Sequence, residues 1–306
     1  MVYKDKKLLN RIYFYTKYGI LRSMRIHVIV DSTSDIPSGY NKNLTVVPLT
    51  VRFGDEEYLD GVNLTHQEFY KKIEEGDVFP QTSQVTPFAF KEAYVNALKD
   101  NDAVICITAS ACVSGTYQSA VLASADMEDQ VAVIDSKNLT IGIKMLADYA
   151  LFLIDQEVDF EEIIRRVNGI RSRVKMLAVF DTLEYLKKGG RMPGAIANVG
   201  NALNLKPGIT LKDGEVTFLG FSRGMKKGFS LLKEKIEEAG GIDYSFPYCF
   251  GYTANPETME KFIEQATYVW EGHDDPATIE RISVGSAIGT HLGSGAIAIA
   301  FIAPKE

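Results

Sequence analysis

The sequence predicts an α/β protein of two lobes, on three observations. In the first half, short continuous apolar runs are each followed by a helical pattern, which is typical of a mostly parallel sheet with helices on both faces. After Asp159, two of the strand candidates are joined by a tight-turn signal at 212–215, which predicts a hairpin. This half therefore indicates a mixed sheet with helices largely on one face. The chain has 306 residues, enough for two packed domains. We therefore expect a three-layer α/β/α lobe followed by a two-layer α/β lobe.

The first lobe has four strand candidates and several helices with recognisable starts. The strand candidates are 26–30 (IHVIV), 46–49 (VVPL), 103–107 (AVICI) and 131–134 (VAVI). Thr65 begins a capping box, and Thr86 is an N-cap with Pro87 at the first helical position. Further helices are expected from about Gly115 and, apolar nearly throughout, over 139–154.

The second lobe begins after a helix that Asp159 caps and that runs to about residue 173. Its strand candidates are 177–180, 209–212, 215–221, 247–252, 281–284 and 296–302, of which the second and third form a hairpin. Helices are expected over 222–239 and 256–270. We divide the chain into an N-terminal extension, an α/β/α domain and a mixed-sheet domain: 1–23, 24–173 and 174–306.

Composition excludes several classes of function. The formal net charge is −7 and no run of four basic residues occurs, so we expect no nucleic-acid partner. The four histidines and three cysteines lack the spacings of a metal site, and we expect neither a metal nor a cofactor. Cys106 and Cys249 lie in apolar runs, which favours buried thiols in a reducing cytoplasm.

Residues 1–23 are basic and aromatic, and 24 begins the first strand region. Neither they nor any later stretch is apolar over a membrane-spanning length, so we expect at most transient contact with a membrane surface. Three interpretations of this extension stay open: an added arm, an amphipathic surface helix, or the product of an upstream start codon.

Polar turns gather where the expected strands end, which is where open α/β sheets bind ligands. They are DSTSD at 31–35, QTSQ at 81–84, SACVSGT at 110–116 and GSAIGTHLGSG at 285–295. Hydroxyls and backbone N–H groups at a helix start can hold an anion, although they also serve as ordinary caps. The Walker and dinucleotide-binding patterns are absent, so the chain has no phosphate cradle of either kind.

Seven segments, in order, resemble the DegV family of bacterial fatty-acid-binding proteins. They are VDSTSDIP (30–37), VVPL with LDGVNLT (46–65), QTSQVTP (81–87), SGTYQSA (114–120), FDTLEYLKKGGRM (180–192), FSRGMKKG (221–228) and GTHLGSGA (289–296). The resemblance covers about 24–304 and implies a two-lobed fold, related to one half of dihydroxyacetone kinases, with an acyl chain buried between and within the lobes. Where the family usually has TSQP, this chain has TSQV, with proline only at Pro87. We expect this difference to affect the rigidity of the loop.

The resemblance implies site residues in two groups. The hydroxyls that hold the fatty-acid carboxylate fall on Thr82 and Ser114. The supporting hydrogen-bond network falls on Asp60, Arg191 and His291. No catalytic residue is implied.

The resemblance also implies a partner, which three basic residues are expected to dock: Arg223, Lys226 and Lys227. A long-chain fatty acid would be presented to a separate ATP-dependent kinase that forms an acyl phosphate, which feeds exogenous fatty acid into phospholipid synthesis. Two alternatives stay open. One is a stand-alone enzyme, either an acyl hydrolase with Ser114 and His291 or a kinase of small ketones; the other is a lipid-sensing module without a kinase partner.

Overall fold

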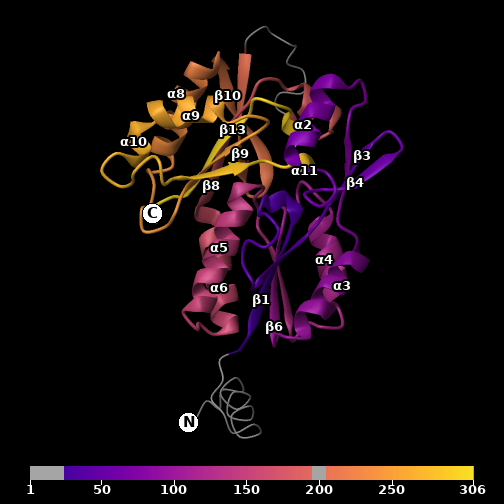
Figure 1. Cartoon of the computed structure of the whole chain (residues 1–306). Helices are drawn as coiled ribbons and strands as arrows, with labels where there is room; N and C mark the ends of the chain where they lie inside the picture. The colour runs from indigo at the N-terminus through magenta and orange to yellow at the C-terminus, as the bar shows by residue number, and fades with distance from the viewer. Residues whose placement is uncertain (1–23, 195–204, 306) are drawn as a thin grey trace, which may run out of the picture.

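The computed structural model describes residues 24–194 and 205–305, and the extension 1–23 lies outside them. Two halves stand one above the other in Figure 1. A four-stranded sheet forms the lower half and a six-stranded sheet the upper half, and a three-stranded sheet completes the β structure of the described residues.

The four-stranded sheet has the order β2-β1-β6-β7, and all its neighbouring strands are parallel. Its strands match the four predicted runs: β1 (Ile26–Asp31), β2 (Leu44–Val47), β6 (Ala103–Thr108) and β7 (Val131–Asp135). The second strand lies two residues earlier than predicted, because Pro48 has no N–H for a neighbouring strand. β1 is buried along its whole length, as expected of an inner strand in a covered sheet.

Helices cover both faces of this sheet (Figure 1). One face carries α3 (Pro87–Leu98) and α4 (Thr116–Ser124), and the other carries α5 (Ile141–Asp155) and α6 (Phe160–Ile170), which the short helix η2 (Arg171–Arg173) extends. The predicted caps are confirmed: Thr86 Oγ1 accepts the Ala89 N–H at 3.2 Å, and Thr65 forms a capping box with Glu68. The three-layer arrangement is therefore confirmed.

The sequence analysis missed the three-stranded antiparallel sheet. It consists of β3 (Thr50–Phe53), β4 (Glu56–Leu59) and β5 (Gln81–Ser83), and α2 (His66–Glu75) lies between β4 and β5 in the chain. Strands this short carry too little periodicity to be recognised. β5 pairs with β3 so that Thr82 lies opposite Val51, which fixes the backbone of the QTSQ segment.

The six-stranded sheet is mixed, with the order β10-β9-β8-β13-β11-β12. Its strands are β8 (Val174–Val179), β9 (Leu205–Lys212), β10 (Glu215–Arg223), β11 (Cys249–Tyr252), β12 (Glu280–Ser283) and β13 (Ile297–Ile302). β11 pairs parallel with β12, and the other neighbours are antiparallel. The predicted hairpin is confirmed: Asp213 and Gly214, both with positive φ, join β9 to β10.

Helices α8 (Met225–Glu238), α9 (Glu257–Gln265) and α10 (Thr267–Trp270) cover one face of this sheet (Figure 1). α8 begins three residues later than predicted, because β10 continues to Arg223 and Gly224 takes a φ of 73°. The predicted helix 256–270 is two helices, divided at the buried Ala266. The two-layer arrangement of this lobe is confirmed, with two shorter helices, α7 (Glu184–Lys188) and α11 (Ser286–Leu292), outside these layers.

Helix α5 packs against both main sheets. One apolar core contains Val28 of β1, Leu146 of α5 and Ala298 of β13, which explains why the α5 sequence is apolar nearly all round. One charged exception is Lys144, whose side chain is 1% exposed and donates to Glu280 of β12 at 2.8 Å. Because α5 joins the lobes in this way, the domain division at 173 stays a prediction.

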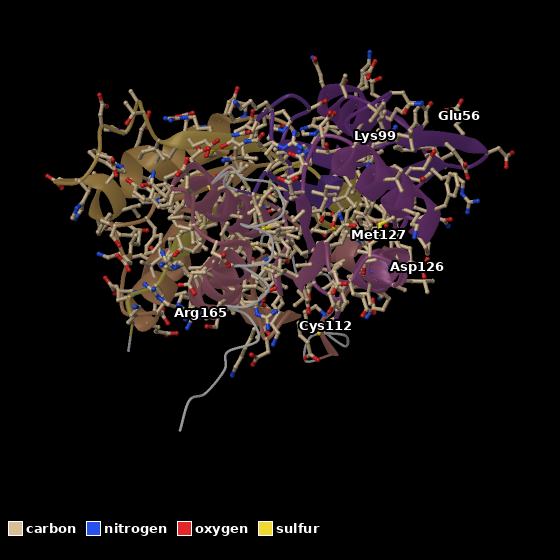
Figure 2. The ribbon with its side chains drawn as sticks, turned by 90° about the horizontal axis from the view of Figure 1, so that it is seen from below. Glu56, Lys99, Cys112, Asp126, Met127 and Arg165 are labelled. Carbon is tan, nitrogen blue, oxygen red and sulfur yellow. The ribbon has the colours of Figure 1, made fainter. Side chains whose placement is uncertain are left out.

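Two expectations drawn from composition can be compared with the structure. Cys106 and Cys249 are buried, and burial raises the pKa of both thiols to about 12, so neither is a reactive nucleophile. Cys112 is exposed and lies at the edge of the molecule in Figure 2. Over residues 24–194 and 205–305, no helix combines the length and the apolar character needed to cross a membrane.

Candidate functional site

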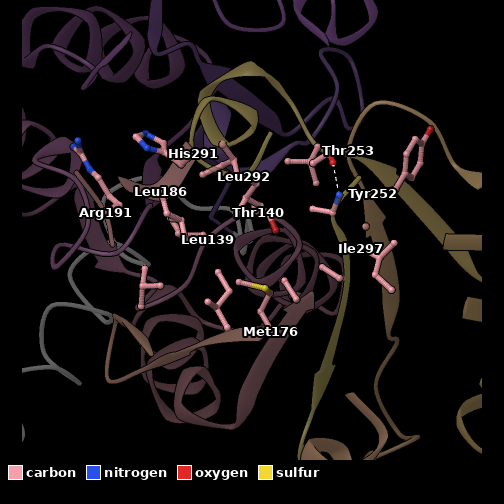
Figure 3. A pocket seen from close by; sticks show the side chains of 18 of the residues that line it. Leu139, Thr140, Met176, Leu186, Arg191, Tyr252, Thr253, His291, Leu292 and Ile297 are labelled. Carbon is pink, nitrogen blue, oxygen red and sulfur yellow. Dashed lines mark hydrogen bonds between the residues drawn. The ribbon is translucent and has the colours of Figure 1, made fainter. Parts of the chain in front are cut away.

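A cavity lies between the six-stranded sheet, the start of α5, and helices α7 and α11. It contains about 630 Å³ of space not filled by atoms, part of it open solvent. Its walls are mostly aliphatic and include Val113, Leu139, Met176, Leu186, Ile209, Val216, Ile288, Leu292 and Ile297. Figure 3 shows Arg191 and His291 together at one end. The cavity therefore has one polar end and a mostly apolar remainder.

Thr82, which is not among the lining residues, contacts His291 beside the polar end, although 209 residues separate them in sequence. Thr82 Oγ1 lies 3.2 Å from His291 Nε2. β5 holds Thr82 half-buried, and the last turn of α11 carries His291 into the cavity wall. A predicted head-group residue and a predicted supporting residue are thus in direct contact.

The surroundings of His291 keep its imidazole neutral. Burial, and after it the Arg191 guanidinium, lower the pKa of His291 to about 4. Its Nδ1 is buried, and the described residues offer it no hydrogen-bond partner. It faces Gly189, where a Cβ would lie 2.1 Å away, so only glycine lets the end of α7 pack on the ring.

We expect the His291 imidazole to titrate near pH 4 in the ligand-free protein. Because this pKa lies below the ordinary value of 6.5, the contribution of His291 to stability is present above about pH 6.5 and decreases as the pH falls towards 4. NMR of the imidazole carbons against pH measures the value, and His291→Asn assigns the signal. A midpoint near 6.5 would contradict the burial described above.

Ser114 lies two residues before α4 and outside the cavity lining, in a loop that packs against the segment following β5. Its Oγ lies 2.9 Å from Thr116 Oγ1 and accepts the Thr116 N–H at 3.3 Å. Gln84, two residues after Thr82, packs its side chain against Gly115, where a Cβ would lie 2.0 Å from Oε1. The two segments predicted to hold a carboxylate are therefore neighbours in space.

Arg191 marks the mouth of the cavity. Its side chain belongs to the lining, whereas the residue as a whole is exposed. Nε donates to the Val113 carbonyl at 3.4 Å, and Nη1 donates to the Gly189 carbonyl at 2.9 Å. Since Val113 precedes Ser114, Arg191 brings positive charge close to the Ser114 loop as well as to His291.

Asp60 is not among the lining residues of the cavity. Its Oδ1 accepts the Ser286 N–H at 3.0 Å and the Ser286 hydroxyl, and Asp35 Oδ1 accepts the neighbouring Gly285 N–H at 2.7 Å. The two buried carboxylates thus hold the start of α11, the helix that carries His291. Asp60 therefore contacts the start of this helix, and its supporting role in the site stays a prediction.

The sequence model of the family described as "Uncharacterised protein, DegV family" matches residues 25–304. The chain belongs to the DegV family. A DegV domain-containing protein of Caldanaerobacter subterraneus subsp. tengcongensis is 35% identical over 281 residues, 90% of this chain and 98% of the relative.

Solved structures of DegV proteins have the same fold. A DegV family protein from Thermus thermophilus, described by its fatty acid binding, has a TM-score of 0.82 and 32% identity over 91% of this chain and all of its own. DegV from Bacillus subtilis, described as a fatty acid binding protein, has a TM-score of 0.78 and 28% identity over 92% of this chain and all of its own. Both likenesses agree with the predicted α/β fold class.

One serine in this DegV protein carries a hydrolase-like pattern. Gly220, Ser222 and Gly224 have the spacing G-x-S-x-G, which in α/β-hydrolases places the serine in a sharp exposed turn. Here Ser222 is buried within β10, and its hydroxyl donates to the Lys206 carbonyl at 3.2 Å. The pattern therefore presents no nucleophile.

The three predicted docking residues lie together where β10 ends and α8 begins. Arg223, Lys226 and Lys227 are all exposed, and among the described residues none has an ion-pair partner. The first turn of α8 contains no acidic residue, so both lysines oppose the positive end of the helix dipole. This basic patch is therefore locally unfavourable for the helix, and its docking role stays a prediction.

Proposed function

We propose that this DegV protein binds a long-chain fatty acid by its carboxylate and presents it to a separate ATP-dependent kinase. The observation that carries the proposal is the apolar cavity with His291 and Arg191 in its lining, Thr82 in contact with His291, and Ser114 in the adjoining loop. Each buried methylene of an acyl chain contributes roughly 0.8 kcal/mol, whereas a carboxylate needs hydrogen-bond donors wherever it is shielded from water.

Thr82 and Ser114 each have a hydroxyl proton available for such a carboxylate. In its Nε2–H tautomer, His291 donates to Thr82 Oγ1, and the Thr82 proton is then free. Ser114 Oγ accepts from the N–H of Thr116 and can accept from its hydroxyl, which likewise frees the Ser114 proton. Two neutral donors bind the head group, while Arg191 balances its charge at the mouth.

The proposed kinase partner follows from the chemistry that these residues do not supply. Neutral hydroxyls hold a carboxylate without burying its charge in an ion pair, so an oxygen stays available for phosphorylation. Phosphoryl transfer needs ATP, a metal ion and a phosphate cradle, which the kinase supplies. The acyl phosphate then feeds exogenous fatty acid into phospholipid synthesis. The exposed basic patch, Arg223 with Lys226 and Lys227, is the docking surface for an acidic face of the kinase.

A stand-alone Ser114–His291 hydrolase has less support. A triad needs its serine, histidine and acid hydrogen-bonded in series. Here His291 Nε2 contacts Thr82, Ser114 contacts Thr116, and Asp60 contacts the start of α11. The three groups do not form that series.

The experiment that tests the proposal has two readouts. Lipid extraction and mass spectrometry of the purified protein are expected to yield a long-chain fatty acid, and the loaded protein is expected to support acyl-phosphate formation when the partner kinase and ATP are added. With Arg223→Glu, Lys226→Glu and Lys227→Glu combined, palmitate affinity stays unchanged and acyl-phosphate formation falls at least tenfold, because docking is lost.

The matched control replaces three exposed lysines elsewhere by glutamate, and so changes the net charge by the same amount. These lysines are Lys42, Lys99 and Lys261. It is expected to support the kinase normally. Equal losses in both triple variants would contradict the docking surface, and the absence of any extracted or bound fatty acid would contradict the carrier function itself.

A further inference from the structure

Thr140 has an unusual backbone conformation at the start of α5. Its φ is 47° and its ψ is −126°, in a region that β-branched residues rarely adopt. It occupies the N-cap position, where a threonine hydroxyl ordinarily accepts a backbone N–H of the first helical turn. No such side-chain bond is present; the Thr140 carbonyl instead accepts the Ile143 N–H at 2.9 Å. The hydroxyl is thus turned away from the helix.

The hydroxyl of Thr140 faces the apolar cavity without a partner. Thr140 is 3% exposed and lines the cavity, and within the described part of the chain its Oγ1 has no hydrogen-bond partner. A buried hydroxyl left unpaired is destabilising. Thr253, the other threonine of the lining, differs, because its Oγ1 accepts the Ala296 N–H at 2.7 Å. Among the described residues of this lining, Thr140 and His291, through its Nδ1 at the head-group end, thus each have an unsatisfied buried polar atom.

The neighbours of Thr140 hold its strained backbone in place. The Asn138 carbonyl accepts the Ser110 N–H at 3.0 Å and the Ser136 hydroxyl at 3.0 Å. The Asn138 side chain donates to the Val174 carbonyl at 3.3 Å and packs so closely on Gly142 that a Cβ there would clash. Strain of this kind persists where the surroundings fix it, and it is concentrated at ligand sites.

The position of Thr140 separates it from the head-group end. In Figure 3 it lies in the middle of the lining, with His291 and Arg191 to one side and Thr253 and Tyr252 to the other. An acyl chain entering at Arg191 would pass Thr140 part-way along its length. Most residues of the lining are aliphatic, and within the described residues the hydroxyl has no protein partner.

We infer that Thr140 is a specificity-determining residue that selects acyl chains carrying a hydroxyl group near the middle of the chain. The inference rests on the proposed fatty-acid binding. A saturated chain leaves the Thr140 hydroxyl unpaired when it fills the cavity. A mid-chain hydroxyl can donate to Thr140 Oγ1 or accept its proton, and both groups are then satisfied. A site built around a polar group discriminates against the ligand that lacks the matching one.

The test compares stearate with a set of monohydroxystearates whose hydroxyl lies between the seventh and twelfth carbons, by competition with a fluorescent fatty acid. The wild-type protein binds at least one hydroxystearate about fivefold or more tighter than stearate. Thr140→Val, which keeps the β-branched shape, loses this preference and binds stearate at least as well. Thr140→Ser retains the preference, and if the valine variant does not fold, Thr140→Ala replaces it.

The outcomes separate this inference from the proposed function. If stearate binds and no hydroxystearate exceeds it, the subsite is wrong and the carrier function stands. If oleate alone gains over stearate through Thr140, the hydroxyl recognises a double bond and the inference is overturned. If the preference for a hydroxystearate over stearate survives in Thr140→Val, another residue or a bound water provides it, and the inference about Thr140 is overturned. If no fatty acid binds, both proposals fail.

Discussion

Replacing Thr82 by valine and Ser114 by alanine together is expected to weaken palmitate binding about 100-fold or more. A hydrogen bond to a charged group contributes roughly 1.5–3 kcal/mol, and this double variant removes two of them. The acyl tail still contributes its burial, so binding becomes weak rather than absent. Valine suits position 82 because β-branched residues favour strands such as β5. Isothermal titration calorimetry with palmitate measures the change.

Two controls make this result specific to the head group. Ser83→Ala alters the neighbouring residue of β5, which is exposed and points to the opposite face, and it leaves the affinity unchanged. Methyl palmitate lacks the carboxylate charge, so we expect the wild type and the double variant to bind it with similar affinity through the acyl chain. An unchanged palmitate affinity in the double variant would place the carboxylate elsewhere, even if fatty acid still binds.

Much of the fold follows from local patterns. The apolar runs of β1 and β6 predicted a covered parallel sheet because a strand buried on both faces has no polar side to alternate with. Thr65 and Thr86 were identified as caps from their immediate neighbours, since capping is a contact within one helical turn. Asp213–Gly214 predicted the β9–β10 hairpin for the same reason.

The candidate site depends on contacts between distant segments, which no local pattern encodes. Thr82 and His291 are 209 residues apart and were given separate roles. Gly189 was noted only as part of the FDTLEYLKKGGRM segment, whereas the structure shows that its missing Cβ makes room for the His291 ring. Thr140 was missed altogether, because the sequence analysis placed it inside the apolar helix expected over 139–154, whereas it is the N-cap of α5. Its positive φ, which only the structure reveals, turns the hydroxyl towards the cavity instead.

Replacing Lys144 by methionine is expected to lower the free energy of unfolding by about 3–5 kcal/mol, the usual effect of breaking a buried ion pair on one side. Lys144 donates to Asp148 of α5 at 2.7 Å, to Glu280 of β12 at 2.8 Å and to the Tyr40 hydroxyl at 3.0 Å. Burial disfavours its charge, yet the two carboxylates outweigh burial and keep the pKa of Lys144 above its ordinary value. Urea denaturation followed by circular dichroism measures the loss.

The matched control is Lys91→Met, which removes the exposed pair that Lys91 forms with Asp126 at 3.2 Å and costs under about 1 kcal/mol. A similarly small loss in Lys144→Met would show that burial does not strengthen the central pair.

Val284, just beyond β12, lines the cavity, and Thr140 lies one helical turn before Lys144. The ion pair therefore holds two cavity walls together. Saturating palmitate binds only the folded form, so we expect it to raise the free energy of unfolding of Lys144→Met. We expect this gain to be smaller than in wild type, because separated walls bind palmitate more weakly; an equal gain would show that the ion pair does not hold the cavity walls.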